Sequence, residues 1–572
     1  MATIHSISIK NFRGINEFYQ SFYGKKFICL IGRGDSGKST ILEAISYVLS
    51  PSWNITFYDS DFYNCDTSDP IEIEATLTDL PELFINEKFG LYIRGINEKG
   101  QIIDDFLEEE VKVKAITIKL SVNDGLEPNW AIVNQRATQE PLILSAAARA
   151  KLNTFLISDY TDKHFSWSKG NPLYSLLKLE DSEDNEDKNI VLNALRNAKK
   201  EIDKNSFDDF KEVIKKIAAK ATEFGVDVSS TTTSIDFKDI SIKDNRVCLH
   251  DEANIPFRLK GKGLKRLISI AIQTSLAGDS GIMLIDEVEQ GLEPDRVQHL
   301  VSSLKKSNKG QIFITTHSSN VVVELDAPDL FLLRRGATEL LNADSSLQAS
   351  IRKNPEALFA NKLIICEGAT EIGICRAINQ HRISQNKVSA AYSGIRLVDG
   401  MGSNFVEYCK GFKKLGFSVC VFCDSDDSGI NSIKEELRVL SISIVDCNKN
   451  NSIERQIFED MPWAGVKELL KYRIEEKENE GVKESIQNQY EGAFPQDWEN
   501  ADTNEMRNAI SKAATFRKQK NNGKEDDKSW FKRIDHGVYL GSVIVKYLGQ
   551  MNGKTIKSQV DFLSNYMDDA RL

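Results

Sequence analysis

The stretch FICLIGRGDSGKST, residues 27–40, decides the fold of the N-terminal part of the chain. The apolar run 27–31 predicts a buried strand, and the segment from Ser39 to Leu49 predicts a helix that ends before Pro51. The loop between them fits the pattern G-x-x-x-x-G-K-[ST], whose backbone N–H groups converge on phosphate oxygens at the start of a helix. The sequence therefore predicts a nucleotide-binding loop between a strand and a helix.

This loop supplies most of the predicted contacts to ATP. Lys38 is expected to reach the β- and γ-phosphates, and the Ser39 hydroxyl is expected to ligate Mg²⁺. A chance glycine-rich turn is the alternative, but the strand before the loop and the helix after it favour the nucleotide site. The predicted nucleotide-binding residues of the loop are Gly32, Gly34, Asp35, Ser36, Gly37, Lys38, Ser39 and Thr40.

Two further apolar strands, at 281–285 and 311–315, end in polar residues that suit the same site. Asp286 is expected to hold Mg²⁺ through water, and Glu287 is expected to be the general base that orients the attacking water. His317 is a candidate contact to the γ-phosphate, although a histidine at a strand end is often only a polar terminus. The order of the loop, the Asp-Glu pair and the histidine along the chain favours the functional interpretation.

A second pair of predicted strands, in LIICEGATE and VCVFCDSDD, leads into acidic residues, which are Glu367, Glu371, Asp424 and Asp426. Residues two apart on a strand project to the same side, so we expect the two aspartates to share a face. Because the carboxyl ends of neighbouring parallel strands meet at one sheet edge, these acids are expected to cluster and to bind Mg²⁺ or Mn²⁺. An ordinary acidic surface loop is the alternative.

The composition is that of a globular protein of several domains. No apolar run approaches the ~18 residues of a membrane helix, and the opening segment lacks the features of a signal peptide, so we expect a cytoplasmic protein that does not contact a membrane.

Nine cysteines are scattered along the chain, and Cys420 and Cys423 lie in an apolar strand, so core cysteines are favoured over a zinc site. The net charge of −11 argues against a nonspecific nucleic-acid coat. The basic stretches 258–266 and 517–533 are candidate DNA contacts or solvated helix faces.

The order of elements predicts an α/β multidomain chain. Short alternating segments between 71 and 135 predict an antiparallel sheet within the first domain. A charged helical stretch interrupts that domain, and dimerisation is a candidate role for it. The predicted parts are an ATPase N-terminal lobe at 1–150, a helical insertion at 151–230, an ATPase C-terminal lobe at 231–355, and a second α/β domain with a helical extension at 356–572.

The first domain resembles the ABC-type ATPase heads of the SMC, RecF and Rad50 group. The segments ISIKNFRGI (7–15) and EQGLEP (289–294) carry this resemblance beside the motifs above. The segment KGKGLKR (260–266) stands where that group keeps its signature loop but departs from the Leu-Ser-Gly-Gly-Gln form. In that group the signature loop completes the ATP site of a second protomer, so the resemblance implies at least a homodimer. The departure leaves open whether ATP is hydrolysed or only sensed.

The second domain resembles the Toprim domain, and the order of the two domains resembles the OLD (overcoming lysogenization defect) family of nucleases. The resemblance implies that Glu367 is the leading catalytic acid and that Asp424 and Asp426 hold metal. It makes Glu454, in the segment NSIE, a further metal ligand. It also makes Lys532, in the segment KSWFK, a stabiliser of charge on the scissile phosphate. Two divalent ions would then activate water and stabilise the leaving oxygen.

The implied function is a nucleotide-regulated, metal-dependent DNA endonuclease that nicks or cuts DNA in bacterial antiphage defence. Within the OLD family, length and layout resemble the nucleases of Gabija systems and of retrons, so a helicase, or a reverse transcriptase with its RNA–DNA product (msDNA), is a candidate partner. Two other classes stay open. One is a DNA-bound ATPase of the repair type with a non-catalytic Toprim clamp, and the other is a scaffold of a defence complex.

Overall fold

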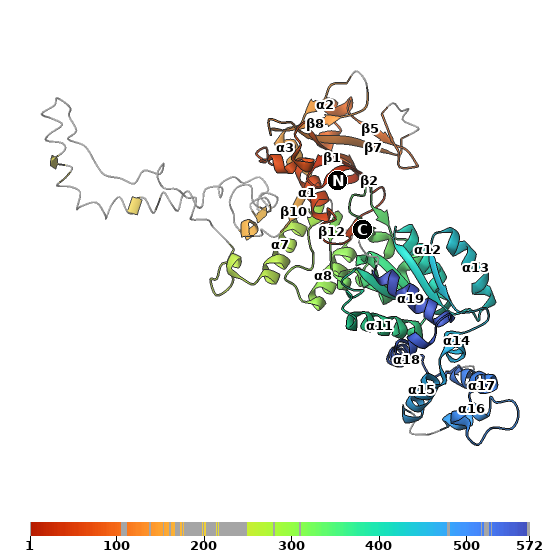
Figure 1. Cartoon of the computed structure of the whole chain (residues 1–572). Helices are drawn as coiled ribbons and strands as arrows, with labels where there is room; N and C mark the ends of the chain where they lie inside the picture. The colour runs from red at the N-terminus through yellow and green to blue at the C-terminus, as the bar shows by residue number, and fades with distance from the viewer. Residues whose placement is uncertain are drawn as a thin grey trace. The chain divides into compact units, whose positions relative to one another are not determined.

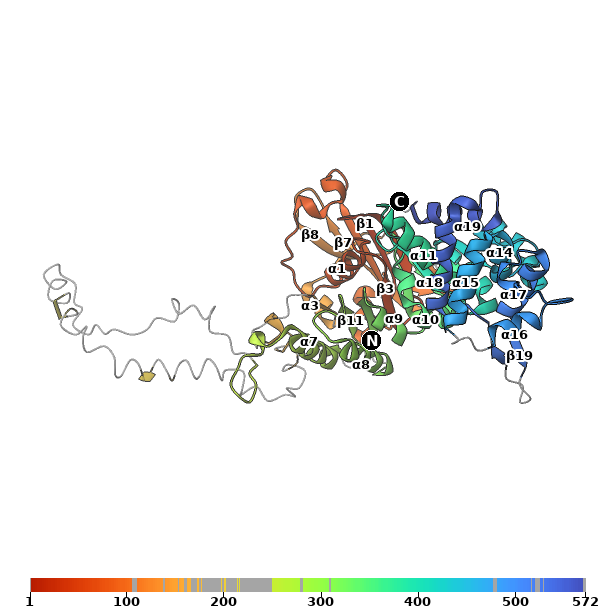
Figure 2. The same cartoon turned by 60° about the horizontal axis from the view of Figure 1, so that its bottom comes forward.

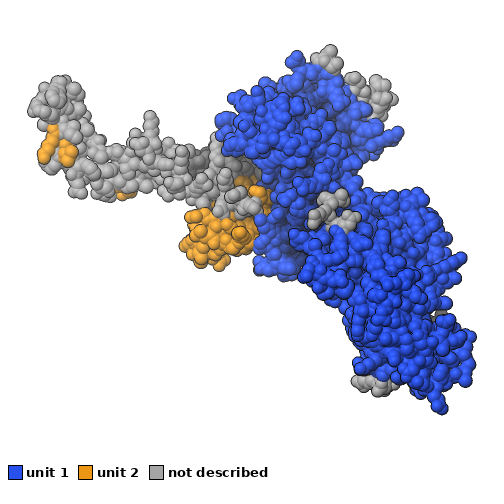
Figure 3. All heavy atoms as spheres, in the orientation of Figure 1, with its two compact units in different colours: residues 1–156, 279–572 blue, residues 157–278 orange. Residues whose placement is uncertain are grey.

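The structure is a computed structural model (Figure 1), and its described residues form two compact units (Figure 3). The units are 1–156 with 279–572, and 157–278. The described residues are mainly 2–104, 111–136, 139–152, 154–158, 162–165, 249–277, 281–307, 310–476, 481–515 and 529–568, with a few isolated ones at 172–216 and 517–527. Most of the predicted helical insertion lies outside them, and so do the side chains of Lys520, Lys524 and Lys528. The predicted domain boundaries therefore stay predictions.

The N-terminal sheet is antiparallel and has the strand order β2-β1-β4-β7-β5-β6, with β8 and β9 continuing from β7. In β4 the first residues alternate between buried and partly exposed, as one buried face requires. This sheet confirms the antiparallel prediction for 71–135. Its strands are β1 (Thr3–Phe12), β2 (Ile15–Ser21), β4 (Ile71–Thr78), β5 (Arg94–Ile96), β6 (Ile102–Ile103), β7 (Val113–Val122), β8 (Pro128–Val133) and β9 (Leu142–Ile143).

The second sheet holds the predicted nucleotide loop. Its strand order is β10-β11-β12-β3-β13-β14, and β11, β12, β3 and β13 run parallel. Every residue of the three strands β3, β11 and β12 is buried, which explains their continuous apolar sequences. The strands are β3 (Phe27–Ile31), β10 (Thr154–Ile157), β11 (Ile282–Ile285), β12 (Gln311–Thr315), β13 (Leu330–Leu332) and β14 (Leu341–Asn342).

Helix α1 (Lys38–Val48) packs on strands of both sheets, and its apolar face is buried. The buried side chain of Gln311 adds a polar tie between the sheets. Its Oε1 accepts a hydrogen bond from the backbone N–H of Ile4 at 2.7 Å, and its Nε2 donates to the carbonyl of Lys25 at 2.9 Å. The other helices that accompany these two sheets are α2 (Glu87–Gly90), α3 (Ala146–Arg149), α8 (Pro294–Ser307), α9 (Ser319–Glu324) and α10 (Gln348–Lys353).

In the second compact unit, helix α7 (Lys262–Ala277) is the main described element. It begins inside the segment 260–266, so most of the predicted signature loop is the first turn of a helix. The side chain of Arg266 in that turn is 3% exposed.

The C-terminal sheet is wholly parallel and has the strand order β16-β15-β17-β18. Cys420 and Cys423 are buried in β17, which confirms the prediction of core cysteines. The strands are β15 (Lys362–Cys366), β16 (Ile395–Asp399), β17 (Ser418–Cys423) and β18 (Ser443–Asp446), and a separate pair is β19 (Arg517–Gln519) with β20 (Glu525–Asp527). The helices are α11 (Ala369–Ser384), α12 (Phe405–Lys414), α13 (Ser428–Val439), α14 (Ile453–Asp460), α15 (Trp463–Glu476), α16 (Val482–Gln487), α17 (Asn504–Ala514), α18 (Ile534–Tyr547) and α19 (Thr555–Asp568). No helix in the described part of the chain is long and apolar enough to cross a bilayer.

Glycines bring α18 directly against α11, although the two helices are far apart in sequence (Figure 1, Figure 2). A Cβ built at Gly373 would lie 2.4 Å from the carbonyl carbon of Gly537. A Cβ at Gly541 would lie 2.9 Å from the Cα of Ile374. These backbone contacts leave no room for a side chain.

We expect Gly373→Ala to destabilise the C-terminal domain by about 1–3 kcal/mol, because the added methyl group meets backbone atoms that cannot move aside. The loss would appear as a lower thermal unfolding midpoint. Gly549→Ala is the matched control, because a Cβ built there has no heavy atom within 4 Å. Equal midpoints for the two variants would contradict the close helix contact.

Candidate functional site

The predicted nucleotide loop follows β3 and has the backbone that only glycine allows at its start. Gly32 has φ of 149°, and a Cβ there would lie 2.5 Å from the carbonyl oxygen of Leu333. The Nζ of Lys38 donates to the carbonyl oxygens of Gly32 at 3.2 Å and Arg33 at 2.9 Å. Burial lowers the pKa of Lys38, while the nearby Asp286 raises it. The loop therefore holds a buried ammonium group over its own backbone.

The acids predicted for Mg²⁺ and water lie beside this loop. Because β11, β12 and β3 are parallel neighbours, their carboxyl ends meet at one edge. The Ser39 hydroxyl donates to Oδ1 of Asp286 at 3.0 Å. Thr315 donates to the same oxygen at 2.6 Å and accepts from the N–H of Glu287 at 2.7 Å. The structure thus brings Ser39, Asp286 and Glu287 together, and it adds Thr315, which the sequence analysis missed.

His317 has an exposed position just beyond β12. Its backbone N–H donates to Oε1 of Glu289 at 2.6 Å, and the Thr316 hydroxyl donates to Oε2 at 2.8 Å. These hydrogen bonds hold the end of β12 in place, and they involve the backbone of His317 and not its imidazole. The proposed contact of His317 with the γ-phosphate therefore stays a prediction.

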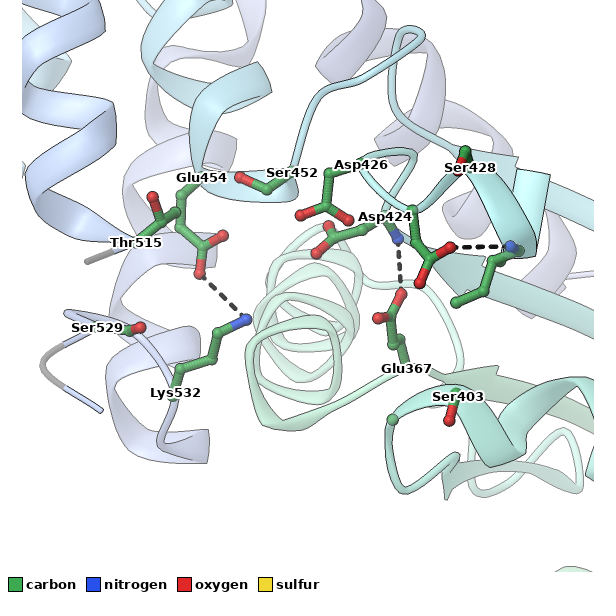
Figure 4. Close-up of a pocket in the computed structure, with 13 residues that line it drawn as sticks. Glu367, Ser403, Asp424, Asp426, Ser428, Ser452, Glu454, Thr515, Ser529 and Lys532 are labelled. Carbon is green, nitrogen blue, oxygen red and sulfur yellow. Dashed lines mark hydrogen bonds and ion pairs between the residues drawn. The ribbon is translucent and has the colours of Figure 1, made fainter. Parts of the chain in front are cut away.

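The second group of acids lies at the carboxyl edge of the C-terminal sheet. The register pairs Cys366 with Phe422, so Glu367 and Asp424 emerge side by side. Oε2 of Glu367 accepts a hydrogen bond from the N–H of Asp424 at 2.9 Å (Figure 4). Oδ1 of Asp424 accepts one from the N–H of Ile453 at 2.6 Å, at the start of α14. Two strands and one helix therefore hold these two carboxylates.

A cavity of about 660 Å³ opens above them. It is lined by five carboxylates, one lysine and several hydroxyls, including Glu367, Asp424, Asp426, Asp427, Glu454, Lys532, Ser403, Ser428, Ser452, Thr515 and Ser529 (Figure 4). The predicted strand alternation of Asp424 and Asp426 is wrong, because β17 ends at Cys423 and both aspartates lie on the following loop. They nevertheless line the same cavity.

A buried lysine supports that loop, and the sequence analysis missed it. The Nζ of Lys434, on α13, donates to the carbonyl oxygen of Asp424 and to the Ser425 hydroxyl, both at 2.9 Å. It also lies 3.1 Å from Oδ2 of Asp446. Lys434 is 4% exposed. From the sequence alone, a lysine on an amphipathic helix is expected at the surface. No sequence pattern therefore predicted that Lys434 is buried.

Glu454 and Lys532 face each other across the cavity wall (Figure 4). The Nζ of Lys532 lies 3.7 Å from Oε1 of Glu454. Glu454 is 1% exposed, yet neither of its carboxylate oxygens has a hydrogen-bond partner among the described residues. Buried carboxylate oxygens are normally satisfied, so this side chain suits a cation or a hydrogen-bond donor from a ligand.

Glu371 is buried beside the cavity and does not appear among the residues that line it. Its Oε2 accepts a hydrogen bond from the N–H of Gly368 at 2.9 Å, at the start of α11. Burial raises the pKa of Glu371 to about 7. Its predicted role as a metal ligand stays a prediction.

The electrostatics of the cavity favour a cation. Burial, together with the neighbouring carboxylates Glu371, Glu454 and Glu367, raises the pKa of Asp424 to about 9, against the opposing effect of Lys532. Burial also raises the pKa of Glu367. Among the residues that the structure describes, no three acids, histidines or cysteines are already arranged around one point as metal ligands. The donor chemistry therefore fits Mg²⁺ or Mn²⁺, with Glu367, Asp424, Asp426 and Glu454 as the candidate ligands.

Two family models match the chain. The model described as "AAA ATPase domain" matches residues 3–322, and the model described as "Overcoming lysogenization defect protein-like, TOPRIM domain" matches residues 358–426. No curated protein matches.

Solved structures of Smc head domains and of RecF also match the chain. An Smc head domain with an extended coiled coil, bound to the C-terminal domain of ScpA from Pyrococcus furiosus, has 14% identity over 61% of this chain and 98% of that chain, with a TM-score of 0.33. An SMC head domain from Thermotoga maritima has 12% identity over 60% of this chain and 99% of that chain, with a TM-score of 0.27. The recombination mediator protein RecF has 14% identity over 59% of this chain and 97% of that chain, with a TM-score of 0.32.

The raised pKa of Asp424 predicts how stability depends on pH. Without metal, the folded protein keeps a proton that the unfolded chain releases above about pH 4, so stability falls as pH rises toward 9. We expect the unfolding midpoint of the wild type in EDTA to fall over this range, and that of Asp424→Asn to fall less. At pH 8, adding Mn²⁺ should raise the unfolding midpoint of the wild type again and leave the midpoint of Asp424→Asn unchanged. A parallel pH response of both proteins would contradict this assignment.

Proposed function

This chain belongs to the AAA ATPase-domain family and has the ATPase–Toprim architecture of OLD-family proteins, and on this premise we propose that it is a nucleotide-regulated, divalent-metal-dependent DNA endonuclease. The observation that carries the proposal is the cavity at the edge of the C-terminal sheet. There Glu367, Asp424 and Glu454 meet Lys532 among a ring of hydroxyl groups. Acids that bind a hard cation, beside a fixed ammonium, suit the anionic phosphodiester of DNA.

The residues take distinct parts in phosphodiester hydrolysis. When bound, Mg²⁺ or Mn²⁺ supplies an activated water and polarises the phosphate. Glu367 and Asp424, which follow two neighbouring strands, would hold the ion, with Asp426 and Glu454 as further candidate ligands. The Lys532 ammonium stabilises the negative charge that develops on the scissile phosphate. The hydroxyls of Ser403, Ser428 and other wall residues supply donors to the flanking phosphate oxygens.

The ATPase part regulates the nuclease in this proposal. Lys38 and Ser39 bind the phosphates and Mg²⁺ of ATP, and Glu287 orients water if ATP is hydrolysed. At least two protomers assemble, because an ATPase head of this kind completes its site with a second copy. High nucleotide holds the nuclease inactive, and nucleotide depletion releases it in antiphage defence.

Cleavage of supercoiled plasmid in Mg²⁺ or Mn²⁺ tests the nuclease directly. We expect Glu367→Gln to lower the rate by at least about 10²-fold, because the substitution keeps the size of the side chain and removes its charge. Glu356→Gln is a matched control, since that exposed acid lies outside the cavity. Metal-independent cleavage, or full activity of Glu367→Gln, would overturn the nuclease site. A protein that hydrolyses ATP but cuts no DNA would favour the clamp or the scaffold.

The regulatory part is tested by titrating ATP into the same assay. We expect ATP to slow cleavage by the wild type and to have no effect on Lys38→Ala, which lacks the ammonium that reaches the phosphates. Nucleotide binding by both proteins is measured in parallel to show that the variant has lost affinity. A cleavage rate that ATP leaves unchanged in the wild type would contradict nucleotide gating.

A further inference from the structure

The segment Trp530–Arg533 carries Lys532 to the cavity, and two buried side chains bind its backbone. This segment leads into α18, and the side chains of Trp530 and Phe531 are buried. The ring of Trp530 packs edge-on against Phe458 of α14, the helix that also carries Glu454. The anchors of Lys532 and Glu454 therefore share one apolar cluster.

Two side chains bind the carbonyl groups that precede Lys532. The Thr370 hydroxyl, in the first turn of α11, donates to the carbonyl oxygen of Phe531 at 2.9 Å. Nδ1 of His536 lies 2.9 Å from the carbonyl oxygen of Trp530. A carbonyl oxygen only accepts hydrogen bonds, so Nδ1 carries the proton in this contact. Both donors are buried, with Thr370 at 0% and His536 at 7% exposure, and neither lines the cavity.

The two hydrogen bonds lie where α11 and α18 are in close backbone contact. A Cβ built at Gly537 would lie 2.8 Å from the carbonyl oxygen of Thr370 and 3.2 Å from that of Ala369. The first turn of α18 therefore rests on the first turn of α11. That same turn of α11 follows Glu367, so the acid at the end of β15 and the lysine before α18 are tied to one short piece of backbone.

We propose that Thr370 and His536 are positioning residues for the Lys532 ammonium. Their bonds to the carbonyls of Phe531 and Trp530 fix the backbone immediately before Lys532, and so fix the place of its ammonium relative to Glu367 and Glu454. The inference rests on the proposed nuclease function. It adds two residues that touch neither metal nor DNA and that act through Lys532.

A double-mutant cycle in the plasmid assay with Mn²⁺ tests this role. Thr370→Val keeps the shape of the side chain and removes the hydroxyl donor, and Thr370→Ser keeps the donor. We expect Lys532→Ala to slow single-turnover cleavage by about 10²–10³-fold. Thr370→Val should slow it by about 10-fold or more, because small misplacements of a charged group are costly. Thr370→Ser should recover most of the rate.

The cycle separates positioning from general damage. In the Lys532→Ala background, Thr370→Val should change the rate by less than about twofold, because the two residues act as a unit. Thr555→Val is the matched control, since Thr555 donates to Asn448 at 3.0 Å at the start of a different helix of the same domain. It should leave the rate unchanged.

The outcomes separate the positioning role of Thr370 from the nuclease function itself. If Thr370→Val slows cleavage equally with and without Lys532, the positioning role is wrong while the nuclease stands. If Lys532→Ala cuts as fast as the wild type, the role of Lys532 itself is wrong. Should Thr370→Val fold poorly by thermal unfolding, His536→Leu against His536→Asn gives the same test, because asparagine retains a donor in place of Nδ1.

Discussion

Repulsion among buried carboxylates is the constraint on which the C-terminal domain depends. Glu367 and Asp424 directly follow neighbouring parallel strands, and Glu454 approaches from α14. Partial burial and mutual proximity make their charged forms unfavourable. The surrounding structure offsets this with the N–H groups of Asp424 and Ile453, which donate to the carboxylates, and with the nearby positive charges of Lys434 and Lys532. Such an arrangement is costly for stability alone, and it is reasonable where a cation is bound.

The two sites of the chain use the same architectural rule. In each, a buried parallel strand ends in a tight turn, and a helix begins within a few residues. At the first site the turn presents backbone N–H groups and Lys38 for an anion, whereas at the second it presents carboxylates for a cation. The polar groups that complete each site come from strands further along the chain, Asp286 and Thr315 in the first case and Asp424 in the second. One chain thus places a candidate anion site and a candidate cation site at the carboxyl ends of two sheets.

The sequence predicted the elements that depend on local pattern. The apolar strands, the glycine-rich turn, the ATPase head and the Toprim domain behind it were all predicted, and the family models confirm the two domains. A continuous apolar run bounded by acids predicts a buried parallel strand, because such a strand has no polar face. Residues whose role depends on a tertiary contact were not predicted. Lys434 and Thr370 owe their positions to contacts with a loop and with a segment more than 150 residues away, respectively, and a single sequence contains no sign of such pairing.

The strand alternation expected for Asp424 and Asp426 failed for a related reason. The carbonyl of Asn451 accepts a hydrogen bond from the N–H of Ser425 at 3.0 Å, so this backbone already follows a loop and no longer pairs with a strand. Only the tertiary structure shows at which residue the hydrogen-bonded pairing of β17 with its neighbouring strands ends. The carboxylate of Glu371 caps the first turn of α11, and its predicted role as a metal ligand stays a prediction.

Anomalous diffraction from crystals of the full chain soaked in Mn²⁺ tests the central claim most directly. The account predicts a manganese peak in the C-terminal cavity, within coordination distance of Glu367 and Asp424 carboxylate oxygens, and the loss of that peak in Asp424→Asn crystals. A cavity without manganese in the wild type, at concentrations that fill the site of the ATPase part, would contradict it.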